Sequence, residues 1–285
     1  MVFVIHTKLN KNKKNNKMKK YFYLTLLVAF TFGTSTNVIG QDSKKEHKTS
    51  MSTGTVNIID IDELIIEGYN GSEVLISTMV EEEEEGNDRS KGLKLLNTLG
   101  LDDNTGFGIS VNREGNILNI RQISQTCSCS EVTIKVPKSM NISVAHDNYD
   151  AEVLLVKNVS SELEITTNHH EVRLEDVTGP MAVKTVYGSI DAKFSQLSQV
   201  GSVSLYSVYE LVDVTIPRSS GMNVTLSAPS GNVFSNVDVN ITSNNNNSSH
   251  NSCQSGTTIT GTLNGGGVEF SIKSAYEDVY FRQSE

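Results

Sequence analysis

The stretch "VYGSIDA" at residues 186–192 decides the fold, because its layout recurs along the second half of the chain. Gly188 is a turn residue, and Ile190 and Ala192 follow it as apolar residues separated by one polar residue. Apolar residues at every second position predict a strand with one buried face. The same layout occurs in "NYDAEVLL" (148–155), "NHHEVRL" (168–174), "VYELVDV" (208–214), "PSGNVFS" (229–235) and "AYEDVYF" (275–281).

The six segments align on their turn residues, which are Ala151, His170, Gly188, Glu210, Gly231 and Glu277. These residues are 19, 18, 22, 21 and 46 positions apart, and the last interval contains an insertion. Four flanking positions, at −7, −5, +2 and +4 from the turn, are then apolar in nearly every segment. Of these 24 positions, only His146 and Ser235 are not apolar. A recurring pattern of this kind predicts a repeat architecture.

A further position, three residues before each turn residue, holds small and mostly hydroxyl-bearing side chains: Asn148, Thr167, Thr185, Ser207, Ala228 and Ser274. Each repeat therefore predicts a strand, a tight turn, a second strand and a connection. A unit of this size cannot bury its apolar face alone, but units stacked about 4.8 Å apart can. We predict an all-β fold, a parallel β-helix or β-solenoid of six or more rungs, each about 20 residues long. A β-sandwich is the rival, although it does not require columns at a fixed interval.

The N-terminal 40 residues predict a signal peptide. A basic start at Met18–Lys20 precedes the apolar run "YFYLTLLVAFTF" (21–32), and small residues before Gln41 suit cleavage. The run is shorter than the roughly 20 residues that a membrane span needs, and Met18 is an alternative start of the chain. The predicted organisation is a signal peptide at 1–40, a polar linker at 41–52 and one β-solenoid domain at 53–285. That domain begins with a less regular β-rich part and carries insertions near 81–104 and 236–256.

Charge and cysteine content narrow the classes of function. The formal net charge is −9, and removing the seven lysines of residues 1–40 takes it to −16. Because nucleic-acid binding depends on basic side chains that neutralise phosphates, this class is excluded. Cys127 and Cys129 lie too far apart along an extended chain for a relaxed disulfide, so either one pairs with Cys253 or stays free.

Two adjacent histidines, His169 and His170, suggest a metal site at first sight. Neighbouring residues of an extended chain point to opposite faces, so the two imidazoles cannot easily share one metal ion. The alignment instead places both at an exposed turn, with His169 stacked near Tyr187. The turn residues His169, His170, Tyr187, Tyr209 and Tyr276 form a predicted interaction ridge. His146 occupies an apolar column and is interpreted as a hydrogen-bonded core histidine.

Acidic residues suggest two other kinds of site. The run Glu81–Glu85 could attract calcium, but it lacks a calcium-loop pattern and is typical of a solvated loop. Outward carboxylates raise the possibility of a polysaccharide-cleaving enzyme: Glu171, Glu175, Asp176, Asp191, Asp213 and Glu277. They are spread over different rungs, and solvation explains them equally well. We therefore expect no catalytic residues, no cofactor and no metal.

Four stretches carry a family resemblance: "RSKGLKLLNTLGLDDNTGFGISVNREGNILNIRQ" (89–122), "VTIKVPKSMNISV" (132–144), "EDVTGPMAVKTVYGSIDA" (175–192) and "LNGGGVEFSIKSAYEDVYFRQ" (263–283). Together they resemble the bacterial "putative-adhesin" domains of unknown function, over roughly residues 55–283. The resemblance implies a β-solenoid-like fold and a location in the cell envelope, and it carries no catalytic residues. The chain departs from the family by its Asn-rich insertion and by Glu or His at several turns where Gly is usual.

These observations favour an exported, non-enzymatic protein that is adhesin-like or associated with the envelope. Its expected partner is an envelope or extracellular macromolecule, and its expected location is the periplasm, the cell surface or the medium. The alternatives are a β-helix polysaccharide hydrolase or lyase, and a periplasmic scaffold without an external ligand.

Overall fold

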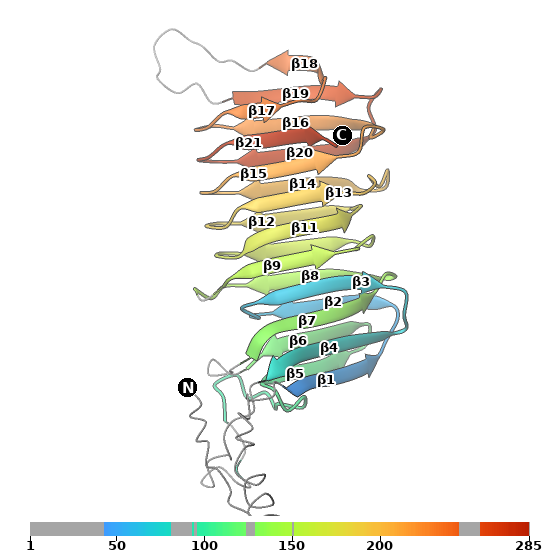
Figure 1. The fold of residues 1–285 in the computed structure, drawn as a ribbon, viewed down its shortest axis with the longest axis vertical. Helices are drawn as coiled ribbons and strands as arrows, with labels where there is room; N and C mark the ends of the chain where they lie inside the picture. The colour runs from blue at the N-terminus through green and yellow to red at the C-terminus, as the bar shows by residue number, and fades with distance from the viewer. Residues whose placement is uncertain are drawn as a thin grey trace, which may run out of the picture. The chain divides into compact units, whose positions relative to one another are not determined.

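The alternating pattern produces strands throughout the part of the chain that the structure describes. This computed structural model describes residues 43–80, 93, 96–123, 129–149, 151–244 and 257–284. Within these ranges there is no helix, and the strands belong to two large mixed sheets (Figure 1). We call the 10-stranded sheet sheet A and the 11-stranded sheet sheet B. The prediction of an all-β fold is confirmed.

The strands are, in chain order, β1 (Ser43–Ser50), β2 (Gly54–Ile59), β3 (Leu64–Tyr69), β4 (Glu73–Val80), β5 (Ile109–Glu114), β6 (Ile117–Gln122), β7 (Cys129–Pro137), β8 (Met140–His146), β9 (Val153–Lys157), β10 (Leu163–Thr167), β11 (Glu171–Val177), β12 (Met181–Thr185), β13 (Ile190–Phe194), β14 (Ser202–Ser207), β15 (Val212–Ile216), β16 (Met222–Ala228), β17 (Val233–Ser235), β18 (Asn240–Asn244), β19 (Thr257–Leu263), β20 (Val268–Ser274) and β21 (Val279–Gln283).

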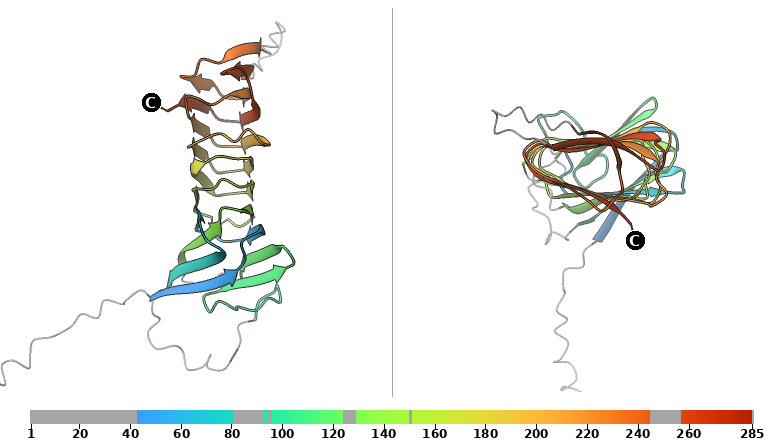
Figure 2. Two further views of the ribbon diagram at one scale, coloured as in Figure 1. Left: turned by 90° about the vertical axis from the view of Figure 1, so that its right-hand side faces the viewer. Right: turned by 90° about the horizontal axis from the view of Figure 1, so that it is seen from above.

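Most strands come in pairs that we call two-strand units, in which a strand of sheet B turns a corner into a strand of sheet A. Units β10–β11, β12–β13 and β14–β15 follow one another, and their strands pair in parallel within each sheet. Leu163 faces Met181, which faces Val203, as the aligned columns predict. Their side chains are buried between the sheets, which face each other in Figure 2.

The order of the units in space differs from their order along the chain. The C-terminal unit β20–β21 lies between β14–β15 and β16–β17. Near the other end, β2–β3 lies between β6–β7 and β8–β9. Segment 275–281 is the last repeat along the chain, but it does not form the last layer of the stack. Every unit offers equivalent parallel edges, so a repeat spacing cannot reveal which unit a late segment joins.

The first aligned repeat is also displaced. His146 pairs with Thr167, and Leu154 pairs with Val172, so the predicted register is off by two residues in β8 and by one in β9. Leu154 and Val156 are buried, whereas Val153 and Leu155 are only half-buried. The cause is a longer corner, because eight positions separate His146 from Leu154, whereas five separate Thr167 from Val172.

The N-terminal part contains antiparallel strands as well. Residues 43–50, within the predicted polar linker, instead form β1, which pairs antiparallel with β4. Strands β5 and β6 form an antiparallel hairpin. Within the predicted insertion at 236–256, residues 240–244 form β18, paired antiparallel with β19. The predicted signal peptide at 1–40, the run 81–85, Cys127 and Cys253 lie outside the described residues.

The column of small hydroxyl residues links neighbouring units at their corners. The Ser207 hydroxyl donates to the Gly188 carbonyl oxygen at 2.8 Å, and the Ser274 hydroxyl donates to the Glu210 carbonyl oxygen at 2.8 Å. Each hydroxyl also accepts a bond from the turn residue of its own unit, as Ser207 does from the Glu210 amide at 3.2 Å. These two corners thereby satisfy backbone groups that the strands leave without ladder partners.

Replacing Ser207 by alanine is expected to lower the free energy of unfolding by about 1–3 kcal/mol, because the Gly188 carbonyl and the Glu210 amide lose their partner. Chemical denaturation followed by circular dichroism measures this change. Ser204→Ala, an exposed position on the same strand, is the matched control. Equal stabilities of the two variants would contradict the role assigned to the hydroxyl.

Candidate functional site

A row of five aromatic rings follows the corners of successive units on the surface. It consists of Tyr149, His169, Tyr187, Tyr209 and Tyr276, and we call it the aromatic ridge. Neighbouring ring centroids lie 4.8, 5.0, 5.0 and 4.9 Å apart. The three contacts from His169 to Tyr276 are stacked, with interplanar angles of 15° or less. The ring spacing matches the spacing of hydrogen-bonded strands, so the parallel units set the stack.

The corner backbone holds each ring in place. The amide of Tyr187 donates to the Asn168 carbonyl at 2.7 Å, and the amide of Tyr209 donates to the Val186 carbonyl at 2.9 Å. These bonds continue the parallel ladder around the corner. Gly188 lies so close to the neighbouring unit that a Cβ atom there would meet the His170 carbonyl oxygen at 1.7 Å. Glycine therefore lets the Tyr187 corner stack directly on the corner below it.

The four tyrosines of the ridge are exposed, and His169 is half-buried. The exposed fractions are 84% for Tyr149, 53% for Tyr187, 43% for Tyr209 and 56% for Tyr276. Because the inner rings cover one another's faces, they present their edges and hydroxyl groups to the solvent. Half-buried Val186 and Val208 lie beside them at the corners. A stacked row keeps its rotamers fixed, which lowers the entropy lost when a partner binds.

The structure places four of the five predicted ridge residues in one row, and the fifth, His170, does not belong to it. His169 stacks on Tyr187 as predicted. His170, predicted at an exposed turn, has no exposed surface and points inward. Tyr149 joins the ridge although the alignment missed it, because the longer first corner displaced its column. The alternation of facing along the chain explains why only one of two adjacent histidines can reach the surface.

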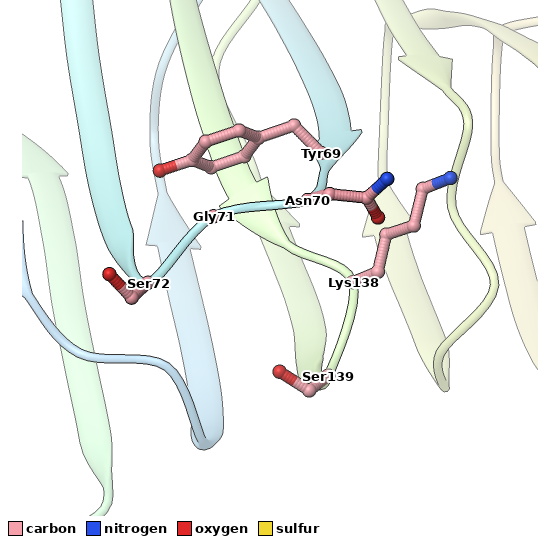
Figure 3. A pocket seen from close by; sticks show the side chains of 6 residues that line it. All are labelled: Tyr69, Asn70, Gly71, Ser72, Lys138 and Ser139. Carbon is pink, nitrogen blue, oxygen red and sulfur yellow. The ribbon is translucent and has the colours of Figure 1, made fainter.

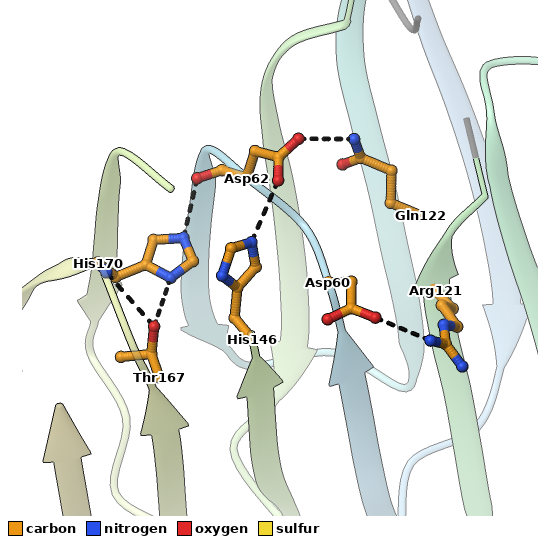
Figure 4. Close-up of polar contacts among 7 residues, drawn as sticks. All are labelled: Asp60, Asp62, Arg121, Gln122, His146, Thr167 and His170. Atoms are coloured by element: carbon orange, nitrogen blue, oxygen red, sulfur yellow. Dashed lines mark hydrogen bonds and ion pairs between the residues drawn. The ribbon is translucent and has the colours of Figure 1, made fainter. Parts of the chain in front are cut away.

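A buried polar cluster surrounds His170 (Figure 4). His146 Nε2 lies 3.1 Å from Asp62 Oδ1, and His170 Nε2 lies 2.8 Å from the Asp62 carbonyl oxygen. The two imidazole centroids are 4.2 Å apart. Asp62 belongs to the corner of the inserted unit β2–β3, so the two histidines attach this unit to the regular stack. The expected core histidine His146 is buried and bonded through Nε2, while its Nδ1 has no hydrogen-bond partner among the residues that the structure describes.

The hydrogen bonds define the neutral form of His170. Its Nε2 faces a carbonyl oxygen, which only accepts, so Nε2 carries the proton. Its Nδ1 then accepts from the Thr167 hydroxyl, 2.9 Å away. Burial lowers the pKa of His170 to about 4, and the adjacent His146 acts in the same direction. Both imidazoles are enclosed, so the cluster stabilises the corner and does not present a base to a substrate.

The other polar residues of Figure 4 also join early strands to this corner. The Gln122 amide donates to Asp62 Oδ2 at 2.9 Å, and Arg121 forms an ion pair with Asp60 at 2.8 Å. The sequence analysis did not single out Asp60 and Asp62. These residues meet the His146 corner only because the unit β2–β3 is inserted beside β8–β9, and no short motif predicts that insertion. Their alternation in "DIDEL" (60–64) was the available signal.

A surface depression of about 540 Å³ lies at the turns after β3 and β7 and is lined by Tyr69, Asn70, Gly71, Ser72, Lys138 and Ser139 (Figure 3). The Tyr69 hydroxyl donates to the Glu73 carbonyl at 2.6 Å. The Tyr69 ring and the Lys138 amine extend to opposite sides. Because its polar groups do not converge, this depression is a weaker candidate than the ridge.

The outward carboxylates are partly brought together. Asp191 faces Asp213 on the next strand, and Asp213 is paired with Arg282. Burial raises the pKa of Asp191, and the charges of Asp213 and Glu171 raise it further. A depression of about 230 Å³ is lined by Phe234, Tyr280, Arg282 and their neighbours, and neither aspartate lines it.

Among the described residues, no group of three or more His, Cys, Asp or Glu side chains is placed to hold a metal ion. No helix within the described ranges is long and apolar enough to cross a membrane.

Comparison with known proteins gives distant structural likenesses. No protein-family profile matches the chain, and no curated protein matches it. A "putative cell adhesion protein" from Clostridium sporogenes ATCC 15579 is 11% identical over 86% of this chain and 100% of its own, with a TM-score of 0.45. A "putative adhesin" from Bacteroides fragilis NCTC 9343 is 10% identical over 86% and 99%, with a TM-score of 0.35. A "putative adhesin" from Parabacteroides merdae ATCC 43184 is 8% identical over 86% and 98%, with a TM-score of 0.29.

The two Bacteroides and Parabacteroides proteins share the adhesin name with the family that the sequence resembles. At such identities and TM-scores, the likeness carries no argument about what this chain binds. The case for a function therefore rests on the chain's own residues.

Proposed function

We propose that the chain is an exported, non-enzymatic β-solenoid that binds an envelope or extracellular macromolecule through the aromatic ridge. The observation that carries this proposal is the exposed, continuous stack from Tyr149 to Tyr276. Contiguous exposed aromatic side chains mark interaction sites more often than scattered ones do, and tyrosine is enriched at binding hot spots. Export is supported by the signal-like segment at residues 1–40.

The solenoid part of the proposal is supported by the parallel register. Columns of equivalent residues run through β10, β12, β14 and β20, and matching columns run through β11, β13, β15 and β21. Stacked units of this kind form a stiff rod-like support. The ridge lies along its stacking direction, which suits an extended partner that meets several rings at once.

Replacing Tyr187, Tyr209 and Tyr276 together by serine is expected to weaken binding to isolated cell envelopes or extracellular polysaccharide at least about tenfold. A pull-down with the purified protein, followed by titration on a glycan array, measures the loss. Tyr206→Ser, a half-buried tyrosine away from the ridge, is the matched control. Circular dichroism verifies that both variants keep the fold.

Cell fractionation and protease accessibility test where the protein acts. A protein protected from external protease favours the periplasmic scaffold over an external binder. Binding that survives the triple substitution removes the ridge from the proposal. The alternative function, a polysaccharide hydrolase or lyase, is favoured by the raised pKa of Asp191 beside Asp213. Release of reducing ends that Asp191→Asn abolishes would establish this alternative.

A further inference from the structure

The two ends of the stack carry different edge strands. The edges at one end are β1 and β5, and those at the other are β17 and β18. β1 contains Lys44, Lys45 and Lys48, and charged edges of this kind prevent pairing with another chain. β17 and β18 read "VFS" and "NITSN" and hold no charge. Each also exposes a large apolar side chain, with exposed fractions of 49% for Phe234 and 49% for Ile241.

The uncharged end is stepped. β17 is the last strand of sheet A, whereas sheet B continues past β16 through β19 and β18. Sheet B therefore extends two strands further than sheet A, which is about 10 Å at the usual strand spacing. Figure 1 shows β19 and β18 beyond the unit β16–β17. Beside the lower step lies the depression of about 230 Å³ between Phe234, Tyr280 and Arg282.

We propose that this stepped end docks against the same end of a second copy of the chain. A two-fold axis parallel to the strands places the two extra strands of each copy over the shorter sheet of the other. β18 of each copy then pairs antiparallel with β17 of its partner, as β18 already pairs with β19. Ile241 enters the depression beside Phe234. Both sheets thus continue through the contact.

A second copy suits this end better than other occupants do. The step in each copy is two strands high, so a copy turned over fills both steps at once. A single extended peptide would pair with one edge and leave the other open. The opposite end of another copy would bring the charged strand β1 against an uncharged edge. A two-fold contact is also closed, and it produces a dimer instead of a filament.

Sedimentation equilibrium and small-angle scattering of the purified protein test the proposal. The expected result is twice the chain mass and a maximum dimension close to twice that of the monomer. Phe234→Lys and Ile241→Lys are each expected to weaken dimerisation at least tenfold while the circular dichroism spectrum stays unchanged. Ile117→Lys, at an exposed position near the charged end, is the matched control and should leave the dimer intact.

Three outcomes would overturn the inference. They are a monomer at all concentrations, a dimer that resists both lysine substitutions, and a dimer that only Ile117→Lys disrupts. If Phe234→Lys or Ile241→Lys fails to fold, the other variant still tests the contact. The length of the wild-type particle also decides the question, because a side-by-side dimer is no longer than one chain. Ridge binding is measured separately, so failure here leaves the proposed function standing.

Discussion

Lowering the pH from 6.5 to 4 is expected to remove about 3 kcal/mol of unfolding free energy through His170 alone. Burial lowers the pKa of this imidazole from 6.5 to about 4 in the folded chain. Between these values, the unfolded chain binds a proton that the folded chain does not, so stability falls as the solution becomes more acidic. Two titratable residues contact His170. They are His146, through its ring, and Asp62, through its backbone carbonyl.

Chemical denaturation at a series of pH values between 4 and 7 measures this effect. His170→Gln is expected to flatten the pH dependence, because glutamine does not titrate and its amide can donate to the Asp62 carbonyl. His169→Gln is the matched control, since this half-buried neighbour lies on the ridge, and its pH dependence should follow that of the wild type. An identical slope for His170→Gln and the wild type would refute the assignment.

Replacing Phe270 by alanine is expected to cost about 3–5 kcal/mol of unfolding free energy, the range for truncating a fully buried phenylalanine. Phe270 is 1% exposed and lies in the inserted strand β20. Its ring centroid is 5.3 Å from that of Phe194 and 6.3 Å from that of Phe281. The large cost is expected because the cavity cannot collapse. The backbones of β20 and β21 hold the neighbouring units β14–β15 and β16–β17 apart.

Urea denaturation monitored by circular dichroism measures this change. The matched control is Tyr206→Ala, because this half-buried tyrosine, whose ring lies beneath the Lys273 amine, should cost less than about 1.5 kcal/mol. A cost of similar size for both variants would be inconsistent with the inserted position of β20.

Prediction from the sequence succeeded where the repeats have equal corners. From Leu163 to Ser207, residues that are aligned in the sequence are also paired on neighbouring strands of the sheets. The reason is that each corner has the same length, five positions from the end of the sheet B strand to the first paired apolar residue of the sheet A strand. Prediction failed in the first unit, where three extra residues fill the corner between His146 and Leu154. A fixed-interval alignment has no means to recognise a lengthened corner.

The candidate site was predictable in part for the same reason. Tyr187, Tyr209 and Tyr276 share a column, and parallel stacking of equal units places them in one row. Tyr149 was missed because its unit is displaced, and His170 was misplaced because its exposure depended on which way one residue of the turn faces. Only the packed structure shows that His170 fills the space beside Asp62.

The sequence by itself determined the strands of the regular units, their buried faces and the row from His169 to Tyr276, because these follow from a period of two within strands and from a repeated spacing between them. Tertiary structure alone decided the order of the units, the insertion of β2–β3 and β20–β21, and the stepped end. The physical reason is that parallel units expose nearly identical edges. Which edges pair is therefore settled by long-range packing, such as Phe270 against Phe194 and the two histidines against Asp62.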